Sequence, residues 1–371
     1  MDETKSLKPS YILVIPKAGI TLQAVCLTQE INHANESLDP PRVCGSKPRM
    51  RNQLLRSRRN LNMVKFKLLG TAAGGGIPQW NCSCTICDTC RQEPKLIPPR
   101  FQLQAIVSGG DEGWFLLNAS PDLRFQIEAN PELHPSSLHG KRSSPIQGIV
   151  LTSADLDQVM GLLLLREFQP LNVYATALVR GVLEANSFFG MLKRIPNQLT
   201  WVEIIPEMPF ALGNTGVVCT PIPLAGDLPY YARSMNSAQP GQSSLGLLLE
   251  SDNRRLAYTP SVPEITEDLI AVYNSCDTIL IDGTFWNNNE LSETHTGTPL
   301  ARAIGHVPMS GDDGSIVLLS NLRTPRKIFI HINNTNPVLD PRSQEYKAVA
   351  ASGWQIGYDG WQLTDDPDNN G

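Results

Sequence analysis

The chain has 371 residues, of which 41% are hydrophobic and 18% charged, a composition typical of a globular protein with a sizeable core. Its apolar runs are too short to cross a bilayer, so the sequence predicts no membrane segment. The net charge of −5 is unevenly spread: residues 1–62 contain ten Lys/Arg and five Asp/Glu, whereas the rest of the chain contains 21 and 31. Such an acidic body argues against nucleic acid as a partner, because phosphate binding needs a basic surface.

Residues 1–62 lack the periodicity of the rest of the chain and end in a basic run. Two explanations are open: a disordered tail, or a true start at Met63 with the earlier residues added by a gene-boundary error. Neither gives the segment a catalytic role. The first residues are acidic where a secretory signal would be basic, and Pro16 and Lys17 interrupt the mildly apolar stretch that follows. We therefore expect a cytoplasmic protein.

From Met63 onwards, apolar strand patterns alternate with helical ones. Strands are predicted at residues 64–69, 104–108, 114–118, 146–151, 171–175, 216–222, 244–250, 255–259, 277–282, 326–332 and 354–358. Helices are predicted at residues 122–129, 155–167, 176–192, 263–274, 297–305, 313–321 and 342–352, and the acidic end, residues 365–371, is expected to fray. The early strands follow one another like hairpins, and the later ones alternate with helices. This order predicts an α/β (α+β) fold with two mixed sheets face to face and helices outside.

Four of the eight cysteines fall within nine residues: Cys82, Cys84, Cys87 and Cys90. A tight cluster in a large chain is typical of a metal site in a reducing compartment. Four soft thiolates suit tetrahedral Zn²⁺ in a closed, structural site. The alternative is a set of free surface thiols, which would oxidise readily. Cys90 is the nearest candidate for the fourth ligand, but a polar side chain from elsewhere could replace it.

A triple glycine precedes this cluster, within residues 70–80 (GTAAGGGIPQW). Glycines after a strand let the backbone approach a ligand or another chain segment closely. The pattern differs from the dinucleotide-binding fingerprint, because we expect a cysteine loop to follow it and not a helix. A tight structural turn is at least as consistent with these residues as ligand binding.

Acidic residues stand at the ends of two predicted strands. Asp155 and Asp157 follow the strand at 146–151, and two carboxylates at such a turn can bind a hard or borderline cation. From this segment alone, however, a helix cap and a dipole-complementing acid explain them better. Asp282 ends an apolar strand, where it either faces a ligand or ties down the following turn.

Two histidines are candidates for metal binding or acid–base chemistry. His331 ends the β-branched strand predicted at 326–332 and opens a polar loop. His306 lies in residues 305–311 (GHVPMSG). For each histidine taken alone, a structural role is the commoner one.

Together these stretches resemble the family of coenzyme PQQ (pyrroloquinoline quinone) synthesis protein B. The matching stretches are residues 70–84 (GTAAGGGIPQWNCSC), 116–124 (LLNASPDLR), 151–157 (LTSADLD), 161–167 (GLLLLRE), 282–286 (DGTFW) and 330–337 (IHINNTNP). The resemblance implies an αββα sandwich of the metallo-β-lactamase type over residues 63–371. It also implies a structural zinc on the Cys-x-Cys-x-x-Cys loop.

The chain departs from the wider fold at residues 153–158 (SADLDQ). The wider fold binds two metals there through His-x-His-x-Asp-His, and all three histidines are absent. Gln158 stands where the resembled family usually has His. A dinuclear hydrolase site is therefore not expected, whereas a single-metal site is. A His at position 158 would create a two-His, one-carboxylate set of the kind that binds oxygen-activating iron.

The resemblance implies a role in making PQQ from a Glu–Tyr unit of a precursor peptide. One implied activity is an iron- and O₂-dependent hydroxylase of the tyrosine ring, in which Asp157 and His331 hold Fe²⁺, Asp155 assists and His306 shapes the surroundings. A second is a carrier or export helper for PQQ or its precursor. A third is a phosphodiester metallo-hydrolase, against which the missing histidines count. The expected partner is the small, dipeptide-derived precursor, and a homodimer is left open.

Overall fold

The computed structural model describes residues 64–110, 113–235, 241–251, 254–294, 298–323 and 325–363. All of them belong to one unit, Arg58–Gly371. The predicted N-terminal extension at 1–62 and the predicted frayed end at 365–371 lie outside the described residues.

The first sheet has six strands in sequence order, antiparallel from β1 to β3 and parallel from β3 to β6. Its strands are β1 (Lys65–Gly70), β2 (Gln104–Ser108), β3 (Trp114–Leu117), β4 (Ile146–Val150), β5 (Leu171–Ala175) and β6 (Leu199–Glu203). The parallel half brings the carboxyl ends of β3, β4 and β5 to one edge of the sheet.

The second sheet has seven strands in the order β13-β12-β11-β10-β9-β8-β7. They are β7 (Phe210–Ala211), β8 (Val218–Leu224), β9 (Ser244–Ser251), β10 (Arg254–Thr259), β11 (Thr278–Asp282), β12 (Arg326–Ile330) and β13 (Trp354–Ile356). Strands β7 to β10 pair antiparallel, and β10 to β13 pair parallel.

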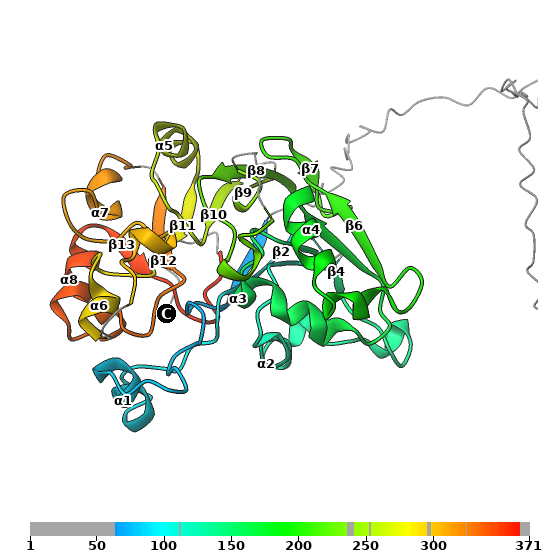
Figure 1. The fold of residues 1–371 in the computed structure, drawn as a ribbon, viewed down its shortest axis with the longest axis horizontal. Coiled ribbons are helices and arrows are strands. Elements are labelled where there is room, and N and C mark those ends of the chain that lie inside the picture. The colour runs from blue at the N-terminus through cyan, green and yellow to red at the C-terminus, as the bar shows by residue number, and fades with distance from the viewer. Residues whose placement is uncertain are drawn as a thin grey trace, which may run out of the picture. The chain divides into compact units, whose positions relative to one another are not determined.

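Helices cover the outer face of each sheet (Figure 1). The α-helices of the described residues are α1 (Thr85–Gln92), α2 (Leu123–Glu128), α3 (Leu156–Val159), α4 (Ala177–Ala185), α5 (Glu267–Asn274), α6 (Glu290–Thr294), α7 (Ser315–Leu318) and α8 (Gln344–Ala351). Figure 1 shows α5, α7 and α8 beside the second sheet and α2 and α4 beside the first.

Three buried clusters confirm a four-layered αββα sandwich. The central cluster joins side chains of both sheets, including Phe66 of β1 and Tyr258 of β10, whose ring centroids lie 6.0 Å apart. A second cluster packs α5 and α8 on the outer face of the second sheet, through Leu269 and Val349 among others. A third packs α4 on the first sheet, for example through Val179. Burial of these apolar faces is what holds the layers together.

Several predicted elements differ from the structure. The predicted helix at 155–167 breaks into α3 and a 3₁₀ segment, Met160–Leu165. Of the described residues in the predicted helix at 297–305, only Arg302–Ile304 form a 3₁₀ turn. The expectation that a loop and no helix follows the triple glycine is wrong in part, because α1 begins at Thr85.

Among the described residues, no helix combines the length and the apolar character that crossing a membrane would require.

Candidate functional site

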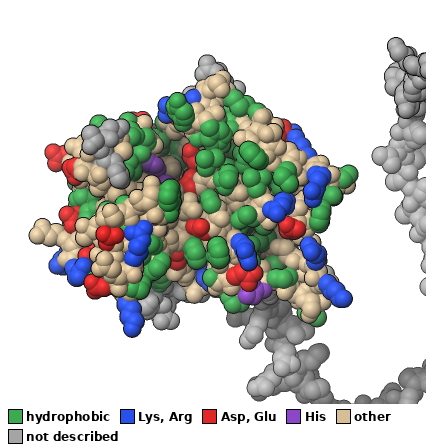
Figure 2. Space-filling model, turned by 60° about the horizontal axis from the view of Figure 1, so that its bottom comes forward, with side chains coloured by type: hydrophobic (Ala, Val, Ile, Leu, Met, Phe, Trp, Pro, Cys, Tyr) green, Lys and Arg blue, Asp and Glu red, His purple; other side chains and the backbone are tan. Residues whose placement is uncertain are grey.

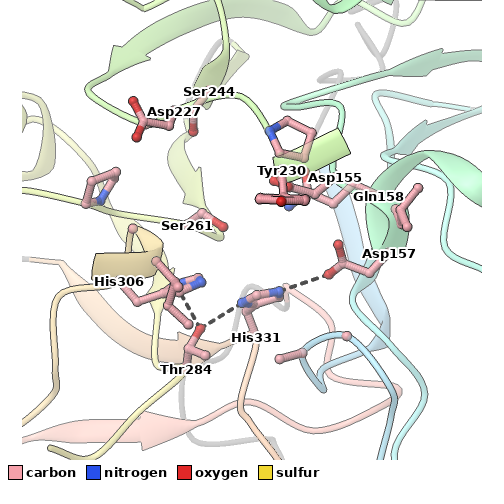
Figure 3. Close-up of a pocket in the computed structure, with 18 of the residues that line it drawn as sticks. Asp155, Asp157, Gln158, Asp227, Tyr230, Ser244, Ser261, Thr284, His306 and His331 are labelled. Carbon is pink, nitrogen blue, oxygen red and sulfur yellow. Dashed lines mark hydrogen bonds and ion pairs between the residues drawn. The ribbon is translucent and has the colours of Figure 1, made fainter. Parts of the chain in front are cut away.

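A cavity of about 910 Å³ opens between the strand ends of the two sheets. Asp155, Asp157, His306 and His331, all predicted from the sequence as site residues, line it. Figure 2 shows this face of the molecule with a hollow in which a histidine lies near acidic side chains. In Figure 3 the labelled side chains converge on the open space from both sides.

The register of two parallel strands places the key side chains at one edge. Strands β11 and β12 pair with Asp282 opposite Ile330, so His331 follows directly beside the end of β11. His331 has a φ of 58°, in the left-handed region that non-glycine residues adopt at a cost. This conformation turns the backbone at the strand end, where the imidazole faces the cavity (Figure 3).

Both ring nitrogens of His331 have partners. Nδ1 lies 2.8 Å from the hydroxyl of Thr284, and Nε2 lies 3.1 Å from Oδ2 of Asp157. These contacts join the first helix after β4 to the ends of β11 and β12 (Figure 3). The Asp157 carboxylate thereby fixes the orientation of the imidazole.

His306 and Asp282 form a buried ion pair, with Nδ1 2.7 Å from Oδ2. Burial raises the pKa of the Asp282 carboxyl, but the two facing imidazoles hold it below its usual range. Burial lowers the pKa of His306, but the Asp282 carboxylate outweighs this and raises it overall. Asp282 also accepts hydrogen bonds from the backbone N–H groups of Val262 and Thr284, so it ties down the turn that follows β11.

Asp282, His306 and His331 form a group able to hold a metal ion. Each offers one ligand atom, and these atoms all lie within 4.8 Å of one another. The two imidazole rings stack 5.4 Å apart, with an interplanar angle of 25°. Two imidazoles and one carboxylate suit borderline cations such as Fe²⁺ or Zn²⁺, so the residues fit a single-metal site.

The structure does not bring Asp155 into this group. Its Oδ2 accepts a hydrogen bond of 2.7 Å from Ser153, and burial together with the neighbouring Asp157 raises its pKa. Gln158 is also turned aside: its Oε1 lies 2.6 Å from the hydroxyl of Thr152. The expected set, in which Asp157 and His331 hold the ion and Asp155 assists, therefore differs from the group that the structure brings together, where Asp282 supplies the carboxylate and Asp157 contacts His331.

Three cysteines form a second group with ligand geometry. The Sγ atoms of Cys82, Cys84 and Cys87 all lie within 4.8 Å of one another. Burial raises the pKa of the Cys84 thiol to about 12. Burial also raises the pKa of the Cys82 thiol, but hydrogen bonds from Cys84, Cys87 and Asn334 bring it below its ordinary value. Three sulfur atoms so close together suit a zinc ion.

Cys90 is not part of this group. It lies on α1, only 1% exposed, and packs in the apolar cluster beneath the second sheet. It lies one helical turn after Cys87 on α1, and its sulfur is not among the three that lie within 4.8 Å of one another. The fourth position is instead approached by Asn334, whose Nδ2 lies 3.2 Å from the sulfur of Cys87.

Sequence patterns identify this site only in part. Asp282 ends an apolar strand, a signal that left two roles open, and the structure shows it tying down the following turn and paired with His306. Thr284 and Asn334 carry no signal of their own, because a hydroxyl and an amide in polar loops are common. Only the pairing of β11 with β12 and the approach of the cysteine loop give them partners.

The fold, with its site at the strand ends, is that of the β-lactamase superfamily. The Beta-lactamase superfamily domain matches residues 113–332. A diphosphatase of the PhnP family shares the fold, with a TM-score of 0.57 at 18% identity, covering 82% of this chain and 98% of that one.

The family within that class follows from nearer relatives. Coenzyme PQQ synthesis protein B of Methylorubrum extorquens (strain PA1) is 39% identical over 303 residues, covering 80% of this chain and 98% of the relative. The protein of the same name from Methylobacterium radiotolerans is 38% identical over 308 residues, covering 81% and 100%. This chain therefore belongs to the coenzyme PQQ synthesis protein B family.

A solved relative was crystallised with zinc. The structure of Zn²⁺-bound PqqB from Methylobacterium extorquens superposes with a TM-score of 0.75 at 38% identity, covering 81% of this chain and all of that one. Zinc in that protein agrees with the zinc-compatible donor sets found in this chain.

Proposed function

We propose that this chain acts in PQQ biosynthesis as a metal-dependent oxygenase that hydroxylates the tyrosine ring of a Glu–Tyr precursor. The pathway is supported by relatives that carry the name coenzyme PQQ synthesis protein B. The chemistry is supported by one observation, the group of Asp282, His306 and His331, whose two histidines line a large cavity. Two imidazoles and a carboxylate are the donor set of non-haem iron oxygenases.

In this proposal the chain's own residues hold and orient the donors. When bound, Fe²⁺ supplies the activation of O₂. Asp282 is fixed by hydrogen bonds from Val262 and Thr284, and His306 is fixed by Asp282. Asp157 orients His331 from the opposite wall of the cavity. An outer partner such as Asp157 keeps an imidazole ligand in one orientation and raises its basicity.

Ring hydroxylation requires a reductant and a cavity that holds the aromatic substrate. One oxygen atom of O₂ enters a ring C–H bond, and the other leaves as water. This balance takes two electrons and two protons from a reductant of the ascorbate or thiol class. The cavity is of a size that suits a small-molecule substrate. Tyr230 and Arg233 in its wall, an aromatic ring and a cation, suit an aromatic acid.

The proposal is tested with metal-free protein loaded anaerobically with Fe²⁺. Glutamyl-tyrosine, ascorbate and O₂ are added, and products are identified by mass spectrometry. We expect a product heavier by one or more oxygen atoms. His331→Ala and Asp282→Asn should abolish it. His134→Ala, which changes an exposed histidine outside the cavity, is the matched control and should retain it.

Two other outcomes would contradict the oxygenase proposal and favour a carrier or a hydrolase. Tight binding of the dipeptide or of PQQ without product, at any metal loading, would point to a carrier. Cleavage of a phosphodiester that depends on His331 would point to a hydrolase.

A further inference from the structure

The cysteine group is closed by a residue from the far end of the chain. Asn334 is 4% exposed and lies four residues after the end of β12. Its Nδ2 is 3.2 Å from the sulfur of Cys87 and 3.8 Å from that of Cys84. It also forms a side-chain hydrogen bond with Cys82. One amide group therefore reaches all three sulfur atoms.

These distances match the edges of a zinc tetrahedron. Zn–S bonds of about 2.3 Å and a Zn–O bond of about 2.1 Å, at tetrahedral angles, separate sulfur from oxygen by roughly 3.6 Å. The observed 3.2 and 3.8 Å lie on either side of that value. The oxygen and nitrogen of an asparagine amide are assigned from hydrogen bonds, and a half-turn exchanges them. In the other orientation Oδ1 stands where the fourth ligand belongs.

The segment that carries Asn334 also carries a residue of the cavity. His331 lies three positions earlier and Asn333 lines the cavity. The N–H of Asn333 donates to the carbonyl of Thr284, and the side chain of Asn336 donates to that of Gly283. Residues 331–336 thus lie between the cavity and the cysteine group, with side chains directed to each.

We propose that Asn334 is the fourth ligand of a zinc ion held by Cys82, Cys84 and Cys87, and that this bond holds residues 331–336, and with them His331, in place. The site is then three thiolates and a neutral oxygen. Asn334 is a positioning residue for His331, and this role does not depend on the oxygenase reaction.

Zinc content and affinity test the ligand assignment. Zinc alone is the probe, with competition against a chromophoric chelator. Asn334→Leu, which removes the donor, should weaken zinc binding at least tenfold, since loss of even outer-sphere partners has effects of about this size. Asn334→Asp keeps an oxygen at the same position and should retain one tightly bound zinc. Cys90→Ala is the control and should retain zinc, because Cys90 lies outside the group.

Asn334→Asp separates ligation from simple hydrogen bonding. If Asn334 only donates N–H to thiolates, a carboxylate there repels them, and Asn334→Asp loses zinc as far as Asn334→Leu does. That result would overturn the assignment. Substituting Co²⁺ adds a second measurement, because the sulfur-to-cobalt absorption should persist in Asn334→Asp and fall in Cys84→Ser.

Hydrogen–deuterium exchange tests the link to the cavity. In the wild-type protein, zinc should slow exchange in peptides covering residues 329–338 and leave those covering residues 171–203 of the first sheet unchanged. In Asn334→Asp the same protection should appear, and in Asn334→Leu it should not. Equal exchange at residues 329–338 with and without zinc would refute the positioning role.

Discussion

Gln158 is the position at which the resemblance to the family leads us to expect a histidine. Its side chain is 2% exposed and its Oε1 lies 2.6 Å from the Thr152 hydroxyl and 3.1 Å from that of Ser153. Engaged in this way, the amide oxygen is not directed to the group of Asp282, His306 and His331. The single-metal site is thereby left without a third imidazole.

Gln158→His should tighten iron binding, because an imidazole at this position would add a nitrogen donor that the amide, held by Thr152, does not supply. We expect a gain of about tenfold or more in affinity, the scale on which changes near metal ligands act. The measurement is anaerobic competition for Fe²⁺, with Gln158→Met as a control of similar length. A gain that is the same for both substitutions would contradict the expectation.

At the residue scale, the sequence predicts donors better than it predicts their partners. His306, His331 and Asp157 are all singled out and all line the cavity, but their expected roles differ from the arrangement found, because His306 belongs to the donor group and Asp157 only contacts His331. Asp155 and Cys90 are also expected in these sites, whereas the groups that the structure brings together contain Asp282 and leave both of them out. Spacing along the chain cannot distinguish these choices, since each depends on which side chains a distant segment brings close.

At the scale of elements, most strands are predicted because their apolar runs are buried on both faces. β2, for example, is buried at all five positions. β6 is missed, because it is an edge strand with no buried position, and so its sequence carries little apolar signal. The predicted helix at 155–167 ends early, because the N–H of Gly161 donates to the carbonyl of Ala119. Contact with another segment has overridden the helical pattern there.

Gly161 permits a close approach between that segment and the turn after β3. A Cβ at this position would lie 2.3 Å from the carbonyl oxygen of Ser120. Gly161→Ala should therefore lower the free energy of unfolding by about 1–3 kcal/mol, as overpacking does. Gly190→Ala is the matched control, because nothing lies within 4 Å of its Cβ. Urea unfolding of the two variants checks this, and equal midpoints would contradict it.

At the scale of the whole molecule, the C-terminal segment joins the two sheets. It leaves β13 of the second sheet and runs along β1 of the first, where Leu68 donates to Trp361 and Leu363 donates to Phe66. Asp359 secures this segment, accepting hydrogen bonds of 2.6 Å from Thr71 and 2.7 Å from the N–H of Phe101. The sequence predicts the two-sheet order from its elements, but it carries no sign of this connection.

Asp359 gives stability a distinct pH dependence. Burial raises its pKa from 3.8 to about 6, despite the hydrogen bonds that favour the carboxylate. Between these two pH values the folded state therefore holds a proton that the unfolded state has lost. Protonated Asp359 stabilises the fold fully below pH ~4, and this stabilisation is lost as the pH rises through ~6. Over this window wild type should lose up to roughly 3 kcal/mol relative to Asp359→Asn. Urea melts of both proteins at intervals from pH 4 to pH 7 check this, and parallel pH profiles would contradict it.

We predict that residues 1–62 are dispensable for the fold. Their excess of basic residues contrasts with the acidic body, and the described fold builds both of its sheets from residues that follow Met63. A protein that begins at Met63 should keep its Tm within about 3 °C of the full chain, a change below roughly 1 kcal/mol. The comparison is made by calorimetry, and collapse of the soluble yield on truncation would refute the prediction.

The separation of Asn334 from the cysteines along the chain has a consequence for synthesis. Asn334 comes 247 residues after Cys87. Since a ribosome adds about 5–20 residues per second, roughly 12–50 s pass before the segment that covers Cys87 exists. In the finished protein this sulfur is fully buried, with Cys87 0% exposed. During this interval the thiols of the nascent chain are exposed to oxidants and to other metal ions. The folded structure does not yet shield them, so their protection depends on the reducing agents of the cell.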